Sequence, residues 1–294
     1  MNSSRSEKKF IEFSLWTRSN QSGLNELLRA LLIQLGFSPL DIIEYIQDEK
    51  RGVTVFLSSV QKAEHLKNIV DHLKLKKIQT RLTVLRKSDW RDKWKRDFLP
   101  FHLTKRLDIV PLWRKRGYRP LKNRQPILLD TITAFGTGLH DTTRFMAQFI
   151  EDSRGRFERF LDIGTGTGIL SLVAFRCEAK YICAIDIDPE CISVAGANIA
   201  SNKFKIDRLE ARGLMDFQSE ELFDYVAANL ITHDLIQCKR KIFSFVKPGK
   251  FLAVSGISIE NAPRLKKEFA EMPLRCLKIY KSRNWAAFLY QRME

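Results

Sequence analysis

Three glycines and two aspartates are the residues of this chain best suited to chemistry. Residues 160–168 read FLDIGTGTG, so an apolar run carries Asp162 and then meets glycines at positions 164, 166 and 168. A second apolar run closes at Asp186, eighteen residues after the last glycine. Glycine lets a backbone approach a ligand closely, and a carboxylate at the end of the next strand can accept hydrogen bonds from both ribose hydroxyls. The pattern indicates a site for a nucleoside cofactor.

The glycine spacing separates two kinds of nucleoside cofactor. Dinucleotide sites carry G-x-G-x-x-G, whose third glycine would fall at Ile169 in this chain. The spacing G-x-G-x-G instead resembles motif I of the S-adenosylmethionine-dependent methyltransferases, whose cofactor has no pyrophosphate. We therefore expect Gly164, Gly166 and Asp186 to contact an adenosine and a methionine tail.

Alternating helix and strand patterns follow from residue 142 onward. Helices are expected at 142–152, 168–177, 189–202, 231–245 and 259–270, and strands at 159–163, 181–186, 222–228, 250–255, 274–280 and 284–290. This alternation predicts a mostly parallel sheet covered by helices on both faces. The last two strands have no helix between them, which predicts an antiparallel edge. Ligands of such sheets bind beyond the carboxyl ends of the strands.

Further polar residues should lie at that carboxyl edge. Asn229 closes the run FDYVAAN, and its amide can accept from an amine and donate to an acceptor; the alternative is that it caps the helix beginning near Ile231. Residues 134–143 read AFGTGLHDTT. Thr142 or Thr143 could cap the following helix and turn a hydroxyl toward the methionine end. His140 is a candidate substrate contact, although a single histidine in a loop is more often a hydrogen-bonding prop.

The first 86 residues predict a small separate α+β domain. Strand patterns at 10–16, 41–47, 53–57 and 80–85 alternate with helix patterns at 24–35 and 60–73. The order β-α-β-β-α-β is that of the ferredoxin-like split motif. Because no catalytic arrangement is visible in residues 1–86, we expect a substrate-recognition domain there. A linker helix and connection at 87–104 should lead to a catalytic domain at 105–294.

Two shorter segments complete this organisation. Trp90, Trp94 and Phe98 lie four residues apart on one face of the linker helix, a stripe that favours packing against a neighbouring domain over stacking on bases. Strands at 107–113 and 126–130 should flank a basic loop.

Charge is concentrated ahead of the glycine loop. Residues 1–125 hold 27 Lys and Arg against 13 Asp and Glu, a net of +14, whereas residues 126–294 hold 23 against 21. The densest piece is RKRGYRPLKNR at 114–124. Two interpretations stay open: a solvated basic surface, or a footprint for an acidic partner, nucleic acid above all.

Composition excludes several classes of protein. The 294 residues are 44% hydrophobic and 29% charged, as in ordinary globular domains. No apolar run reaches the roughly 18–20 residues that span a membrane, and the polar N-terminus does not resemble a secretory signal. Five cysteines form no C-x-x-C pair, which predicts reduced thiols, a cytoplasmic location and no metal site.

Taken together, four motifs resemble the ribosomal protein L-eleven methyltransferase family. They are AFGTGxHxTT at 134–143, LDIGxGxG at 161–168, DxDP at 186–189 and ANL at 228–230, with tryptophans at 90, 94, 113 and 285 that fit the same pattern. The resemblance covers essentially the whole chain. It implies a Rossmann-like class I methyltransferase domain with a mostly parallel seven-stranded sheet behind a ferredoxin-like domain. It also implies cofactor contacts at Thr143, Gly164, Asp186 and Asn229.

The same resemblance implies an activity and its participants. S-adenosyl-L-methionine would donate methyl groups to lysine ε-amines of a large-subunit ribosomal protein, with the N-terminal α-amine as a further candidate. Apart from the resemblance, we expect a monomer. The neutral amine must attack in line with the sulfonium, and no general base is evident, so positioning should carry catalysis. The basic residues 1–125 could contact ribosomal RNA on an assembling particle.

Departures from the family pattern leave the substrate more open than the cofactor. Thr131-Ile-Thr133 stands where the family has Pro-Gly, and Leu139 and Asp141 flank the histidine. Leu230-Ile-Thr232 replaces Ile-Leu-Ala. One alternative is an RNA methyltransferase acting on ribosomal RNA, opposed by the lack of a Pro-Pro-aromatic run after Asn229 and of a Pro-Cys loop. A cofactor-sensing or RNA-binding protein without turnover is another.

Overall fold

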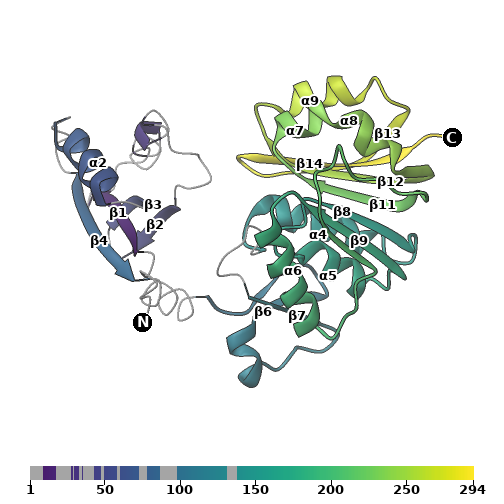
Figure 1. Ribbon diagram of the computed structural model, residues 1–294, viewed down its shortest axis with the longest axis horizontal. Helices are drawn as coiled ribbons and strands as arrows, with labels where there is room; N and C mark the ends of the chain where they lie inside the picture. Colours follow the sequence, from purple (N-terminus) through teal and green to yellow (C-terminus); the bar gives the residue numbers. More distant parts are fainter. Residues whose placement is uncertain are drawn as a thin grey trace, which may run out of the picture. The chain divides into compact units, whose positions relative to one another are not determined.

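The computed structural model describes most of the chain, in two compact units. Described are residues 9–17, 28, 30–32, 35, 43–47, 50–57, 60–72, 78–86, 98–130 and 138–294. The units comprise residues 1–97 and 98–294 (Figure 1). The finer boundaries expected from the sequence, with a linker at 87–104, stay a prediction.

The first unit contains a four-stranded antiparallel sheet. Its strands are β1 (Lys9–Thr17), β2 (Ile43–Gln47), β3 (Lys50–Leu57) and β4 (Gln79–Arg86), in the order β2-β3-β1-β4. Apolar side chains at alternate positions of β1 and β3, including Phe13 and Val55, join one hydrophobic core, because successive side chains point to opposite faces. This strand order confirms the predicted split motif.

Helices cover one face of that sheet. Helix α2 (Val60–His72) buries Ala63, Leu66 and Val70 at spacings of three and four residues, as an amphipathic helix does. The predicted helix at 24–35 is described at few positions, but Leu28 and Leu32 are helical and buried in the same core. Both predicted helices thus contribute to one hydrophobic core.

The second unit is built on a seven-stranded sheet. Its strands are β8 (Arg159–Ile163), β9 (Tyr181–Asp186), β10 (Arg208–Ala211), β11 (Phe223–Asn229), β12 (Val246–Ser258), β13 (Leu274–Lys281) and β14 (Trp285–Arg292). The order is β10-β9-β8-β11-β12-β14-β13. The first five are parallel, and β14 lies antiparallel between β12 and β13. The predicted fold class and antiparallel edge are confirmed.

One strand of this sheet escaped the sequence patterns. Strand β10 is four residues long, lies at the sheet edge and alternates charged with apolar side chains, so no buried apolar run marks it. The sequence patterns located six strands of this sheet, and β10 completes the seven that the family resemblance implied.

Six helices pack on the two faces of the sheet. They are α4 (Asp141–Asp152), α5 (Ile169–Arg176), α6 (Pro189–Ser201), α7 (Thr232–Gln237), α8 (Lys239–Ser244) and α9 (Ala262–Phe269). Figure 1 shows α4, α5 and α6 on one face and α7, α8 and α9 on the other. The single helix predicted at 231–245 is wrong, because Cys238 leaves helical geometry (φ −98°, ψ 7°) and separates α7 from α8. None of the helices that the structure describes is long and apolar enough to cross a membrane.

A small three-stranded sheet flanks this domain. It consists of β5 (Phe101–His102), β6 (Leu107–Pro111) and β7 (Gln125–Leu129), with β6 and β7 parallel. Strand β6 ends at Pro111, two residues earlier than predicted, because the 3-10 helix η1 (Leu112–Gly117) begins at the next residue. Phe98 lies outside any helix and packs on Phe101 and Trp113 of its own unit. Trp90 and Trp94 lie outside the described residues, so packing of the aromatic stripe against a neighbouring domain stays a prediction.

Two asparagines on α6 attach β7 to the domain. Asn202 accepts from the Leu128 N–H (2.9 Å) and donates to the Leu128 carbonyl (2.7 Å). Asn198 accepts from the Asp130 N–H (2.7 Å) and donates to the Thr167 carbonyl in the glycine loop (2.9 Å). Since both asparagines are buried, these bonds replace water for backbone groups that would otherwise be unsatisfied. Strand β7 is thereby held beside the loop that follows β8.

A buried carboxylate joins β8 to α5. Asp162 Oδ2 accepts from Thr165 Oγ1 (2.8 Å), Ser171 Oγ (2.8 Å) and Ser171 N (3.1 Å). Within the described ranges, Asp162 Oδ1 has no hydrogen-bond partner. Burial, with a smaller contribution from the charge of Asp186, raises the pKa of Asp162 to about 6.

Removing the Asn202 amide should destabilise the catalytic domain. In Asn202→Ala the buried N–H and carbonyl of Leu128 lose their partners, which we expect to cost about 2–4 kcal/mol of unfolding free energy in urea titrations. The matched control is Ser201→Ala, whose partly exposed hydroxyl only bonds the Ala197 carbonyl, and it should change stability by less than about 0.5 kcal/mol. Equal losses of unfolding free energy in the two variants would contradict the stabilising role of the Asn202 bonds to the Leu128 backbone.

The pH dependence of stability should carry the signature of Asp162. Because its pKa is higher in the folded than in the unfolded chain, the unfolding free energy should fall as pH rises from about 4 to about 6. With about 1.4 kcal/mol for each pH unit between the two pKa values, the loss is about 3 kcal/mol. In urea titrations, the unfolding free energy of Asp162→Asn should not show this fall between about pH 4 and about pH 6. Parallel pH profiles for the variant and the native chain would refute the assignment of the fall to Asp162.

Candidate active site

The glycine loop turns the chain from β8 into α5 through left-handed backbone. Gly164, Gly166 and Gly168 have φ values of 72°, 54° and 80°, a region that disfavours residues with a Cβ. The Gly164 N–H donates to the Ile185 carbonyl at 2.9 Å, which ties the loop to the end of β9. A Cβ on Gly164 would lie 2.6 Å from Leu230 Cδ2. The positive φ values therefore require glycine here, whereas the flexible end of the Leu230 side chain can shift to admit a Cβ.

Asp186 at the end of β9 faces this loop. Its Oδ2 accepts from the Gly166 N–H (2.9 Å), and its Oδ1 accepts from the Asp188 N–H (3.0 Å). Each carboxylate oxygen has a second lone pair. The carboxylate is thus oriented by backbone donors and can still accept two hydrogen bonds from a diol.

Asn229 at the end of β11 lies next to the same loop. It pairs with Ser255 of β12 and is half-buried, and the following residue, Leu230, is the one that contacts Gly164. Helix α7 begins at Thr232 with Ile231 as its N-cap and no side-chain cap, so the alternative role of Asn229 as a cap is not supported. No hydrogen bond joins its amide to another side chain or backbone group in the described part of the chain.

The start of α4 differs from the expectation. Of the residues FGTG at 135–138, the first three belong to the segment 131–137 outside the described residues, and Gly138 is described. Helix α4 begins at Asp141, so His140 is the N-cap and the predicted cap by Thr142 or Thr143 is wrong. His140 Nδ1 bonds Thr142 Oγ1 (2.7 Å), and its ring meets Trp285 edge-on with 4.9 Å between centroids. Burial lowers the pKa of His140, which favours the neutral imidazole.

Thr143 occupies the first turn of α4 with an unsatisfied hydroxyl. Its side chain is 1% exposed, and Oγ1 has no hydrogen-bond partner among the residues that the structure describes. Buried hydroxyls in proteins are nearly always bonded, and the exceptions call for an explanation. A ligand that reaches this hydroxyl would supply one.

The parallel topology places these groups at one edge of the sheet. Strands β8, β9 and β11 all end there, and Trp285 starts the antiparallel β14 opposite Ser258 at the end of β12. The glycine loop, Asp186 and the Asn229 turn are in direct contact. The predicted site residues therefore form two groups. Gly164, Gly166, Asp186 and Asn229 make up the first. The second consists of His140, which contacts Trp285, and Thr143 in the first turn of α4.

Exposed apolar residues at the same edge were missed by sequence reasoning. Ile187 follows Asp186 and is 81% exposed, Met215 is 64% exposed, and Ile231 beside Asn229 is 53% exposed. A Cβ on Gly213 would lie 3.8 Å from Ile187 Cδ1, which brings the Met215 turn close to Ile187. Large apolar side chains exposed together mark a binding surface. Ile187 and Ile231 lie one and two residues after the predicted site residues Asp186 and Asn229, which was the available signal, whereas no motif marked Met215.

Comparisons with known proteins agree with this arrangement. The family model for ribosomal protein L11 methyltransferase (PrmA) matches residues 37–293. A ribosomal protein L11 methyltransferase from Geobacter sulfurreducens is 33% identical over 210 residues, 71% of this chain and 68% of the relative. The corresponding protein of Listeria innocua is 29% identical over 242 residues, 81% of this chain and 76% of the relative.

A solved structure extends the similarity to three dimensions. The ribosomal protein L11 methylase of Lactobacillus delbrueckii subsp. bulgaricus aligns with a TM-score of 0.61 and 27% identity, over 67% of this chain and 100% of that chain. The predicted enzyme class and methyl donor are confirmed, a methyltransferase that uses S-adenosylmethionine. The family model spans the glycine loop, Asp186 and Asn229, and this chain belongs to the ribosomal protein L11 methyltransferase family.

Proposed function

We propose that this protein transfers methyl groups from S-adenosylmethionine to lysine ε-amines of ribosomal protein L11, with the N-terminal α-amine as a further acceptor. The observation that carries the proposal is the Asp186 carboxylate, bonded to the Gly166 N–H and open to a diol, beside the unengaged amide of Asn229. Family membership supplies the substrate class. It favours a protein substrate over ribosomal RNA and argues against a binding protein without turnover.

The residues at the carboxyl edge fit the proposed cofactor. Asp186 would accept from the ribose hydroxyls, and the exposed side chains of Ile187 and Met215 would cover the adenine. The glycine loop keeps side chains away from the methionine tail. The unsatisfied hydroxyl of Thr143 would bond a polar group of that tail. When bound, the cofactor supplies an electrophilic methyl group on a sulfonium.

Asn229 would position the amine that receives the methyl. Its side-chain carbonyl can accept an amine N–H, which directs the nitrogen lone pair away from the amide. Only a neutral amine has that lone pair, and apolar surroundings lower the pKa of an ammonium group. The exposed side chains of Leu139 and Ile231 would exclude water once a protein substrate covers them. The lysine ammonium loses one proton to solvent before it attacks the methyl group, which its lowered pKa allows without a general base, so positioning carries the reaction.

Further parts of the proposal concern partners and location. We infer that the enzyme acts as a monomer in the cytoplasm, which agrees with the five cysteines being free thiols. We also infer a contact with ribosomal RNA through the basic residues 1–125, because their net charge of +14 would repel a free basic protein.

Substitutions at Asp186 should act on the cofactor. Asp186→Ala loses both acceptors for the ribose, and we expect cofactor affinity measured by titration calorimetry to fall at least 100-fold. Asp186→Asn keeps one acceptor oxygen and should give an intermediate loss. Native affinity in the alanine variant would exclude this assignment of the site.

Substitution of Asn229 should act mainly on turnover. For Asn229→Ala we expect kcat to fall about 10- to 100-fold, because the amine loses its acceptor, with a smaller loss of cofactor affinity. The assay is transfer of radiolabelled methyl to purified ribosomal protein L11, with naked ribosomal RNA in parallel. Label confined to the RNA would overturn the proposed substrate.

The hydroxyl of Thr143 offers a separate test of the cofactor contact. Thr143→Val keeps the shape and removes an unsatisfied group, so thermal stability without cofactor should stay equal or rise. Cofactor affinity should fall about 5- to 20-fold if the hydroxyl bonds the methionine tail. Unchanged affinity together with raised stability would mean that the hydroxyl has no ligand.

A further inference from the structure

A second concentration of functional groups lies at the opposite edge of the sheet. Helices α4, α5 and α6 each precede a strand, so their last residues lie at the amino edge, away from the glycine loop. Arg154 follows α4, Arg176 ends α5, and Lys203 follows α6. The basic segment 112–124 connects β6 to β7 on the same side of the domain. Cations distant in sequence therefore gather here.

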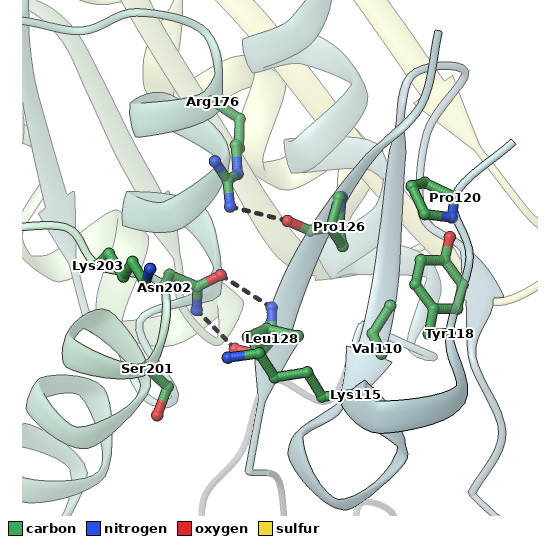
Figure 2. A pocket seen from close by; sticks show the side chains of 10 residues that line it. All are labelled: Val110, Lys115, Tyr118, Pro120, Pro126, Leu128, Arg176, Ser201, Asn202 and Lys203. Carbon is green, nitrogen blue, oxygen red and sulfur yellow. Dashed lines mark hydrogen bonds between the residues drawn. The ribbon is translucent and has the colours of Figure 1, made fainter. Parts of the chain in front are cut away.

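Two cavities open between these elements. One has a volume of about 300 Å³ and lies between the end of α6 and the β6–η1–β7 segment. It is lined by Lys115, Arg176 and Lys203, by the ring of Tyr118, and by no carboxylate (Figure 2). The second, of about 410 Å³, lies beyond the start of β7 and shares Arg176. Figure 2 shows Lys115 extending from η1 toward the α6 side, where Lys203 lies beside Asn202.

Arg176 between the two cavities is incompletely satisfied. One terminal nitrogen donates to the Pro126 carbonyl at 2.9 Å, whereas Nε is buried and has no hydrogen-bond partner in the described part of the chain. No ion pair links its guanidinium to a carboxylate among the residues that the structure describes. A partly buried cation without an anion is costly, and its pKa is accordingly lowered by burial. An anion that enters either cavity would supply the missing partner.

Some of the other basic side chains around the two cavities already pair with a carboxylate, and others do not. Arg124 is committed to the buried Asp108, with Nε 2.7 Å from Oδ1, and Asp108 also accepts from the Tyr118 hydroxyl. Arg154 pairs with Glu178. Lys115 and Lys203 are exposed and, within the described ranges, pair with no carboxylate. Lys115, Arg176 and Lys203 are thus the cations that remain available, and the Asp108 bonds hold the Tyr118 ring in the cavity wall.

We propose that the cavity lined by Lys115, Arg176 and Lys203 binds phosphate groups of single-stranded RNA, with the Tyr118 ring as a surface for a base. The proposal rests on the RNA contact inferred above and places it on the catalytic domain. Free phosphate could bind the same cations. The segment 112–124, however, carries further exposed cations at Arg116, Arg119 and Lys122 and no acidic residue, which suits an extended polyanion. Binding at the amino edge leaves the carboxyl edge free for the protein substrate.

The test is RNA binding by the full chain. Fluorescence anisotropy would follow a fluorescein-labelled single-stranded 20-nucleotide RNA over a series of salt concentrations. Lys115→Glu with Lys203→Glu should weaken binding at least tenfold and flatten the dependence of log affinity on log salt, which has a slope of about −0.7 for each phosphate contact. The control is Lys266→Glu with Lys267→Glu, two exposed lysines of α9 with the same change in net charge.

The outcomes separate the site from the RNA contact itself. Equal losses in the two double variants would overturn the site and leave a general charge effect. Absence of binding by the native chain would overturn both the site and the RNA contact, without touching the methyl transfer. Free phosphate that saturates the protein while RNA does not bind would overturn the assignment to RNA. Methyl transfer by Lys115→Glu with Lys203→Glu should stay at the native level, which shows that the variant is folded.

Discussion

The backbone turn between β8 and α5 is the constraint on which the catalytic domain depends. Within residues 164–168 the chain must leave a buried strand, pass close to Leu230 and enter a helix, and it does so with three left-handed glycines. Asp162 beneath the turn is held by Thr165 and Ser171, although burial raises its pKa. This loop also orients the Asp186 carboxylate, which accepts a hydrogen bond from the Gly166 N–H. Residues 164–168 therefore connect the strand to the helix, pack against Leu230 and orient the carboxylate of the cofactor site.

Neighbouring elements are aligned to that turn by a few buried polar bonds. Asn198 connects the loop carbonyl at Thr167 to the strand extension at Asp130, and Asn202 holds β7 one helical turn further along. These bonds place the small sheet, and with it the basic segment 112–124, against α6. The same helix begins near the cofactor edge and ends near the basic cavity, so a single rigid element relates the two.

The two edges of the sheet have different chemistry. The carboxyl edge combines one oriented carboxylate, one free amide and exposed apolar side chains, which suits a nucleoside and an amine. The amino edge combines cations with an aromatic ring and has no acid in its first cavity. Positive potential from that edge would attract polyanions and disfavour free basic proteins. Separation of the two functions follows from the alternation of parallel strands and returning helices.

Local sequence patterns account for most of the architecture, because hydrophobic period, glycine spacing and turn residues act locally on the backbone. The βαββαβ order, the glycine loop with Asp186, and the family all followed from such patterns. Tertiary structure decided the rest. Strand β10 forms because β9 offers an edge, and the break at Cys238 has no local breaker residue. His140 instead of a threonine caps α4, while Asn198 and Asn202 find partners some 70 residues away. Such partners depend on which surfaces meet after folding, and spacing along the chain does not encode them.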